Sequence, residues 1–144
     1  MIRTTREALQ QTTLGGDDEA YRLIRFPAGA VTVAAGIVAE VGSPFCVMLV
    51  DVYEVTLIVS EEAVEEFAGR LHGATIESSR YRLITFDVVL PPGLVGFMAA
   101  VSAAVARAGV SILPFGAYSR DHILVRESQY DDAIAALKSL IESA

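Results

Sequence analysis

The hydrophobic pattern in the second half of the chain changes from a short strand-like run to a longer helix-like run. Residues 81–89 (YRLITFDVV) are rich in Ile, Phe and Val, which is typical of a strand. Residues 93–109 then show helical spacing, and Gly109 is a suitable terminator. The apolar residues that recur at this spacing are Leu94, Phe97, Met98, Val101 and Val105.

Two further strands and a second helix are predicted after this run. The strands cover residues 110–119 and 122–125, with a turn at 119–121 between them. An amphipathic helix follows over residues 128–143. Its apolar stripe consists of Tyr130, Ile134, Leu137 and Ile141. The predicted order is therefore β-α-β-β-α.

The first half of the chain repeats this pattern. Residues 21–26 (YRLIRF) and 81–86 (YRLITF) share five of six letters. A second pair of segments, 57–71 and 123–137, matches at an offset of 66 residues, with an aliphatic triplet, a Glu and a pair of acids in the same places. Two matches in the same order indicate duplication of one unit.

The first unit is less clear than the second. Its helix candidate at residues 30–41 is weak, because three consecutive β-branched residues, Val31–Val33, disfavour a helix. The remaining pieces are strands at 44–50 and 55–59, a helix at 61–71 and a fourth strand at 74–78.

The second unit has no residues left for a fourth strand. Either the N-terminal segment fills this edge of its sheet or a second chain does. Within that segment, Thr4 and Glu7 have the spacing of a capping box, so it forms a short helix or is a loose tail.

These elements predict an α+β fold built from two ferredoxin-like βαββα(β) units, with antiparallel sheets and helices on one face. The expected division is an N-terminal extension over residues 1–20, a first unit over 21–80 and a second unit over 81–144.

Composition and charge exclude several classes of partner. The 144 residues carry a net charge of −7 and no basic run, which argues against nucleic acid and against an anionic membrane surface. Residues 88–106 contain no charge, but Pro91, Pro92 and Gly93 interrupt that run, so we expect a buried helix rather than a membrane span. The single cysteine and the lack of a signal-peptide pattern suggest a cytoplasmic protein.

Candidate catalytic residues are few. His72 and His122 fall in different units and have no Cys or acidic neighbours at metal-ligand spacing. Cys46 lies in an apolar strand, where a buried small hydrophobe is the more common role. The acidic pairs at helix starts suit the helix dipole. We therefore expect no enzyme activity, no metal and no cofactor, and a small enzyme remains the weakest alternative.

Residues 44–59 and residues 108–125 resemble two segments of the tandem ACT-domain family, whose members are small regulatory modules that bind amino acids. The second unit's signature corresponds to residues 108–125 (AGVSILPFGAYSRDHILV), although residues 116, 117, 119, 120 and 122 depart from the pattern. The first unit corresponds at residues 44–59, without the two Thr of the family segment. The resemblance covers roughly residues 21–140 and is nearest to compact two-ACT bacterial proteins and CASTOR-type arginine sensors.

The resemblance implies an effector site at the interface between modules, near the turn from the first strand to the first helix. On this chain that turn is residues 87–96, with a wall from the facing strand. Backbone N–H groups at 93–96 would hold an α-carboxylate, and Asp87 would meet an α-amino group. The alternative is a Pro-Gly turn that only starts a helix. The candidate residues are Asp87, Val89, Leu90, Gly93, Leu94, Val95, Gly96, Ile112 and Leu113.

Two functions follow. The first is a non-catalytic, allosteric regulatory module that binds a small amino acid and forms a homodimer. The second is a structural or protein-interaction module of the same fold that has lost its ligand, which the departures from the family pattern favour.

Overall fold

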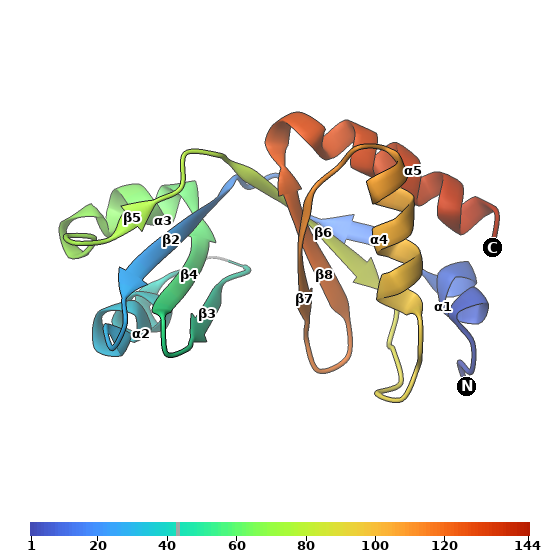
Figure 1. Cartoon of the computed structure of the whole chain (residues 1–144), viewed down its shortest axis with the longest axis horizontal. Coiled ribbons are helices and arrows are strands. Elements are labelled where there is room, and N and C mark those ends of the chain that lie inside the picture. The colour runs from blue at the N-terminus through green and yellow to red at the C-terminus, as the bar shows by residue number, and fades with distance from the viewer. Residues whose placement is uncertain (43) are drawn as a thin grey trace. The chain divides into compact units, whose positions relative to one another are not determined.

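The computed structural model describes residues 1–42 and 44–144. It divides into two compact units, shown with their elements in Figure 1. The central unit comprises Glu19–Tyr81, and the composite unit comprises Met1–Asp18 together with Arg82–Ala144. The first 18 residues therefore cluster with the second repeat.

The central unit has the element order β-α-β-β-α-β. Its elements are β2 (Tyr21–Pro27), α2 (Val31–Glu40), β3 (Val47–Val50), β4 (Glu54–Ser60), α3 (Glu61–Glu66), the 3₁₀ turn η1 (Ala68–Arg70) and β5 (Thr75–Ile76). Strand β4 pairs antiparallel with both β2 and β3, and β5 pairs antiparallel with β2. Side chains from the sheet and helices form one core cluster that includes Phe26, Ile37 and Leu57.

Helix α2 forms although its sequence disfavours a helix. It begins at Val31, so the three β-branched residues make up its first turn. Ala34 and Ile37, one turn further on, are fully buried in the core of the central unit. Packing of this face stabilises the helix more than the β-branched residues destabilise it, because helix propensity is a weak effect per residue.

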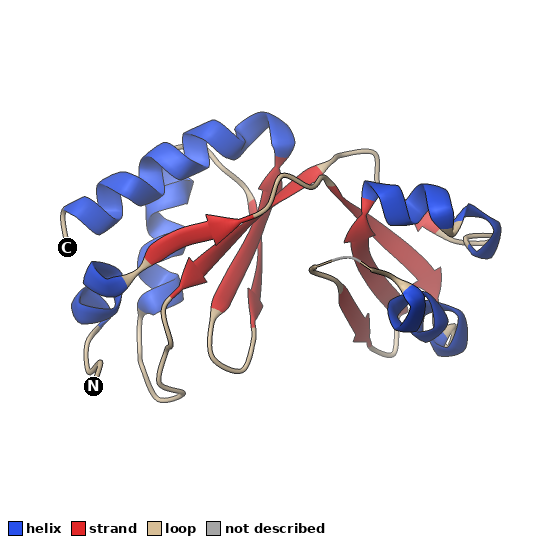
Figure 2. Ribbon diagram, turned by 180° about the vertical axis from the view of Figure 1, so that it is seen from behind, coloured by secondary structure: helices blue, strands red, loops and turns tan. Residues whose placement is uncertain are grey.

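The composite unit has the second repeat's order preceded by a helix and a strand. Its elements are α1 (Thr5–Gln11), β1 (Thr13–Gly16), β6 (Tyr81–Asp87), α4 (Phe97–Arg107), β7 (Ile112–Gly116), β8 (Asp121–Arg126), the 3₁₀ turn η2 (Glu127–Gln129) and α5 (Tyr130–Glu142). The strand order is β1-β6-β8-β7, with β1 antiparallel to β6 and β7 antiparallel to β8. Figure 2 shows the helices and strands by colour. The predicted α+β class with antiparallel strand pairs is confirmed.

The N-terminal segment supplies the fourth strand of the composite unit. Strand β1 pairs with β6 from Thr13↔Asp87 to Gly16↔Ile84. Before it, α1 is capped as its sequence allows, because the Glu7 N–H donates to Thr4 Oγ1 at 3.1 Å. This segment, rather than a second chain, fills the edge that the repeat left open.

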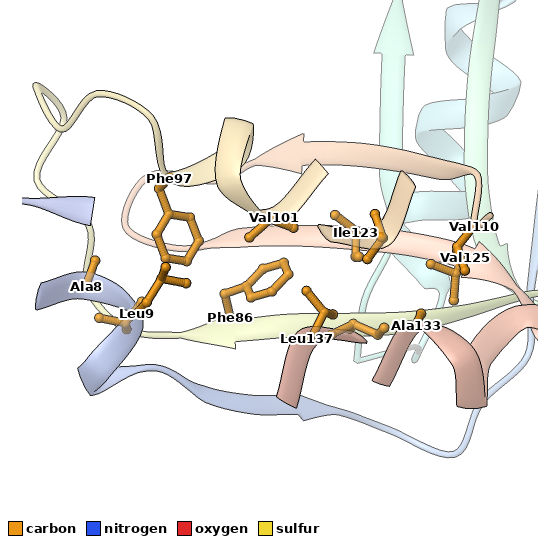
Figure 3. Close-up of a cluster of buried hydrophobic side chains, with 13 residues drawn as sticks. Ala8, Leu9, Phe86, Phe97, Val101, Val110, Ile123, Val125, Ala133 and Leu137 are labelled. Carbon is orange, nitrogen blue, oxygen red and sulfur yellow. The ribbon is translucent and has the colours of Figure 1, made fainter. Parts of the chain in front are cut away.

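Alternate residues of β6 and β8 form the floor of the composite core. Ile84, Phe86, Ile123 and Val125 point to the helix-covered face of the sheet, where they pack with α1, α4 and α5. Figure 3 shows Phe97 and Val101 of α4, Leu137 of α5 and Leu9 of α1 in this cluster. The core thus fixes the start of α4 against the end of β6.

Helix α4 begins four residues later than the predicted run. Gly96 precedes it in the left-handed conformation, with φ +98°, so residues 93–96 form a turn and not the first helical turn. Across the described residues, no helix is both long enough and apolar enough to span a membrane. The uncharged run is instead divided between this loop and α4.

Candidate functional site

A cavity of about 330 Å³ lies at the start of α4, within the composite unit. Two segments line it: the loop and first helical turn at residues 90–99, and the β7–β8 turn at residues 117–121. Both segments lie at the same end of the unit (Figures 1 and 2). The lining residues are Leu90, Pro91, Pro92, Leu94, Gly96, Phe97, Met98, Ala99, Ala117, Tyr118, Ser119, Arg120 and Asp121.

The loop is held by short backbone contacts. The Leu94 N–H donates to the Pro91 carbonyl at 3.0 Å, which closes a turn after the two prolines. The Thr5 hydroxyl of α1 donates to the Val95 carbonyl at 2.9 Å. A Cβ on Gly96 would lie 3.3 Å from Thr5 Oγ1, so glycine there allows α1 to approach the loop. The N-terminal helix therefore helps to shape the cavity.

A second contact joins the loop to the β7–β8 turn. The Leu90 N–H donates to the Ser119 carbonyl at 2.8 Å. Within the turn, the Ala117 N–H donates to the Arg120 carbonyl at 3.0 Å. These bonds fix the two sides of the cavity relative to each other.

The polar groups that line the cavity come from the first turn of α4 and from the β7–β8 turn. The first main-chain helical bond runs from the Ala100 N–H to the Gly96 carbonyl, so the N–H groups of Phe97, Met98 and Ala99 precede the helical ladder. Among the residues that the structure describes, no side chain caps this helix start. Such N–H groups favour an anion, with the helix dipole adding to the effect.

The charged side chains of the β7–β8 turn have different surroundings. Arg120 Nε donates to Asp87 Oδ1 at 2.8 Å, and its Nη1 contacts Ser119 Oγ at 3.1 Å. Asp121 also lines the cavity, and partial burial raises the pKa of its carboxyl above the usual range, an effect that neighbouring His122 opposes. Asp121 is therefore the carboxylate at the cavity, whereas Asp87 is paired with Arg120 beside it.

The structure separates the predicted site residues into groups. Three of them line the cavity: Leu90, Leu94 and Gly96. Val89 lines a neighbouring cavity, while Gly93, Val95 and Asp87 line neither.

The predicted wall of Ile112 and Leu113 does not line the cavity. Ile112 packs against the helix-side core. Leu113 follows it on β7, so its side chain points to the other face of the sheet. Two consecutive strand residues cannot form one wall of a site.

The β7–β8 turn was not predicted from the sequence to line the site. Tyr118, Ser119, Arg120 and Asp121 are some thirty residues from the loop in sequence but line the same cavity. The signal in the sequence was the polar, charged turn at 119–121, which the analysis used only as a connection between strands.

A second cavity of about 680 Å³ adjoins the first. The two share five lining residues, which are Leu90, Pro91, Pro92, Tyr118 and Ser119. The second cavity extends toward the N-terminal residues. Its other lining residues are Met1, Ile2, Gln11, Val88 and Val89.

Two other reactive residues, His122 and Cys46, are not among the described residues that line the two cavities. His122 Nδ1 lies 2.9 Å from Thr85 Oγ1, and burial lowers the pKa of the imidazole, opposed by Asp121. Burial raises the pKa of the Cys46 thiol in the central unit, which disfavours the nucleophilic thiolate. Within residues 1–42 and 44–144, no cluster of three His, Cys, Asp or Glu side chains could hold a metal.

Comparisons with known proteins agree with this architecture. A family profile described as ACT domain matches residues 78–139. A protein of unknown function from Vibrio cholerae, described as a possible transport protein, has a TM-score of 0.72 at 23% identity, over 96% of each chain. A protein from Agobacterium tumefaciens has a TM-score of 0.71 at 14% identity, over 90% of this chain and 88% of that chain.

A regulatory subunit is also among the similar structures. The regulatory subunit of aspartate kinase from Thermus thermophilus, in a ligand-free form, has a TM-score of 0.63 at 16% identity, over 90% of this chain and 97% of that chain. Comparison with curated proteins gives no match. Together these findings support an ACT-type fold, with the family match in the second repeat.

Proposed function

We propose that the chain is a non-catalytic regulatory module that binds a small amino acid in the cavity at the start of α4. One observation carries this proposal: the cavity combines N–H groups of a helix start with the Asp121 carboxyl. A free amino acid carries the two complementary charges, an α-carboxylate and an α-ammonium group, on the same carbon atom. Its α-carboxylate would accept from the N–H groups of Met98 and Ala99, and its α-amino group would donate to Asp121.

The comparisons support the regulatory part of this proposal by analogy of fold. An aspartate kinase described as an allosteric enzyme and a regulatory subunit of aspartate kinase are similar in structure to this chain. We propose the same regulatory role for this chain. We also propose that the chain forms a homodimer and that it is related to compact two-ACT proteins and CASTOR-type sensors. The absence of activity is part of the proposal.

A second candidate is an interaction module of the same fold that binds no amino acid. The Arg120–Asp87 pair favours it, because Arg120, a cation that lines the cavity, is already paired with a carboxylate of the same chain. In this case the cavity forms only because the loop before α4 packs against the β7–β8 turn, and it holds no ligand. The module would then act by binding a protein partner.

Thermal unfolding of the full chain with each of the twenty amino acids separates the two candidates. A ligand at about one hundred times its Kd stabilises the folded chain by about 2.7 kcal/mol. For a chain of this length that corresponds to a rise in Tm of roughly 5 to 10 °C. A rise with a small set of amino acids supports the first function, and no rise with any of them supports the second.

Two variants show whether the ligand occupies this cavity. Asp121→Asn keeps the shape of the side chain but removes its charge, and should weaken binding about tenfold or more, the usual loss for a charge-assisted hydrogen bond. Asp131→Asn, in the first turn of α5 and outside both cavities, is the control with the same change of charge. Equal affinities of both variants and the unmodified chain would place the ligand elsewhere.

A further inference from the structure

We infer that the bound amino acid has a large apolar side chain, which extends from the cavity at α4 into the adjoining cavity at the N-terminal residues. This inference rests on the proposed function and adds the class of ligand.

The adjoining cavity offers an apolar environment. Most of its described lining residues are apolar, among them Ile2, Val88 and Leu90 with two prolines. The polar groups beside them are the side chains of Gln11 and Ser119 and the α-amino group of Met1, and no described lining residue has a charged side chain. By contrast, the first cavity has the charged side chains of Arg120 and Asp121 and the N–H groups of the α4 start. A ligand that fits both has a charged head and an apolar tail.

The two cavities are positioned to hold one molecule. They share the segment 90–92 on one side and Tyr118 and Ser119 on the other. The hydrogen bond from the Leu90 N–H to the Ser119 carbonyl keeps these sides together. A ligand whose α-carboxylate and α-amino group are bound by α4 and Asp121 would therefore have its side chain next to this shared boundary.

Apolar side chains around the adjoining cavity are exposed to solvent in the structure. Val89 is 57% exposed and Tyr118 is 101% exposed. Single exposed apolar residues are common, but residues gathered around one cavity are typical of a binding surface. An aliphatic or aromatic ligand side chain would cover this surface, whereas a charged one would lose its hydration there without an oppositely charged side chain among the described lining residues.

The N-terminal segment contributes to the selection of the ligand. Ile2 lines the adjoining cavity and also packs against the core of the composite unit. The segment thus has a second role besides completing the sheet through β1. Residues that the repeat does not contain therefore take part in this site.

The test is isothermal titration calorimetry of the full chain with Ala, Val, Leu, Phe, Lys and Asp. We expect affinity to increase about fourfold for each buried methylene from Ala to Leu. Lys and Asp should bind at least tenfold more weakly than Leu. If none of the six amino acids binds, the proposed function fails with the inference. If Ala, Lys or Asp binds as tightly as Leu, the inference is overturned and the proposed function stands.

A pair of exposed valines gives matched variants. Val89→Asp places a carboxylate at the adjoining cavity and should weaken Leu binding tenfold or more, while Ala binding stays within about twofold. Val95→Asp is the control, because Val95 is 87% exposed and lines neither cavity. An unchanged Leu affinity in Val89→Asp, or an equal loss in Val95→Asp, would overturn the inference.

Discussion

Arg120 and Asp87 form an ion pair across the ends of β8 and β6, with Nε 2.8 Å from Oδ1. Arg120 also lines the cavity at α4, whereas Asp87 does not. Asp87 therefore holds the Arg120 guanidinium at the edge of the proposed amino-acid site and neutralises its charge.

Asp87→Asn should leave the fold intact and strengthen effector binding. Both side chains are more than one-third exposed, so loss of the pair should lower the free energy of unfolding by less than about 1 kcal/mol. The guanidinium that is released can approach the ligand's carboxylate, which should increase affinity about tenfold. Calorimetric titration measures this change.

The control for Asp87→Asn is Asp18→Asn. Asp18 is fully exposed and lies 3.9 Å from Arg82 in the same unit, so the change of charge is the same, although it is remote from the cavity. Equal affinities in the two variants would show that Arg120 does not act on the ligand.

The two glycines of the loop should respond differently to substitution. A Cβ on Gly93 meets nothing within 4 Å, and Gly93 has no positive φ. Gly93→Ala should therefore be neutral or stabilise by up to about 1 kcal/mol, because it restricts the unfolded chain. Gly96→Ala should destabilise by about 1 to 2 kcal/mol, because φ is +98° and the Cβ would lie 3.3 Å from Thr5 Oγ1.

Urea denaturation of both glycine variants measures these differences. Thr5→Ala, made in both the unmodified chain and the Gly96→Ala background, distinguishes backbone strain from crowding, because alanine removes the Oγ1 that a Cβ on Gly96 would approach. The single variant measures the loss of the hydrogen bond to the Val95 carbonyl. Equal stability of Gly93→Ala and Gly96→Ala would contradict the loop geometry described above.

His122 should make the folded chain less stable in mild acid. Burial lowers the pKa of its imidazole below the ordinary value of 6.5, so the folded state favours the neutral ring. This contribution to stability is present above the unfolded pKa and is lost as the pH falls through the folded pKa. The free energy of unfolding should therefore decrease from about pH 7.5 to about pH 5.

The variant His122→Gln should flatten that decrease, because glutamine has no charge to gain. Asp121→Asn is the control in the same turn. Burial raises the pKa of the Asp121 carboxyl, so its contribution to the free energy of unfolding is lost as the pH rises. The contribution of His122 has the opposite pH dependence, and the two effects can therefore be told apart. Denaturation at a series of pH values would contradict the assignment if His122→Gln kept the full slope.

The fold could be predicted from the sequence because local signals agree with the packing. The match between residues 21–26 and 81–86 identified the first strand of each repeat, and Gly109 marked the end of α4. The helix at Val31 was harder to predict, because the burial of Ala34 and Ile37 stabilises it and burial is a tertiary effect.

The candidate site was only partly predictable. The loop around Leu90 and Leu94 came from the family resemblance, and the structure places these residues at a cavity. The β7–β8 turn could not be assigned to it, since the contact between Leu90 and Ser119 is a long-range backbone bond without a side-chain pattern. The predicted wall of Ile112 and Leu113 stays a prediction, although alternation along β7 turns these two side chains to opposite faces of the sheet.

Adjacent glycines in β1 provide the strictest test of the N-terminal strand. A Cβ on Gly16 would lie 2.5 Å from the Leu83 carbonyl oxygen, closer than any side chain tolerates, and the φ of Gly16 is +149°. A Cβ on Gly15 would lie 3.7 Å from the Thr85 carbonyl oxygen, an ordinary contact. Gly16→Val should therefore separate the end of β1 from β6, whereas Gly15→Val should preserve the pairing.

Separation of β1 should also change the behaviour of the free β6 edge. An unpaired strand edge offers N–H and C=O groups to another chain, so Gly16→Val should associate at high concentration while Gly15→Val should not. Hydrogen exchange of the β6 amides, combined with sedimentation of both variants, measures the two effects. Full protection of the amides facing β1 in Gly16→Val would contradict this prediction and show that the pairing of β1 with β6 does not depend on the close approach at Gly16.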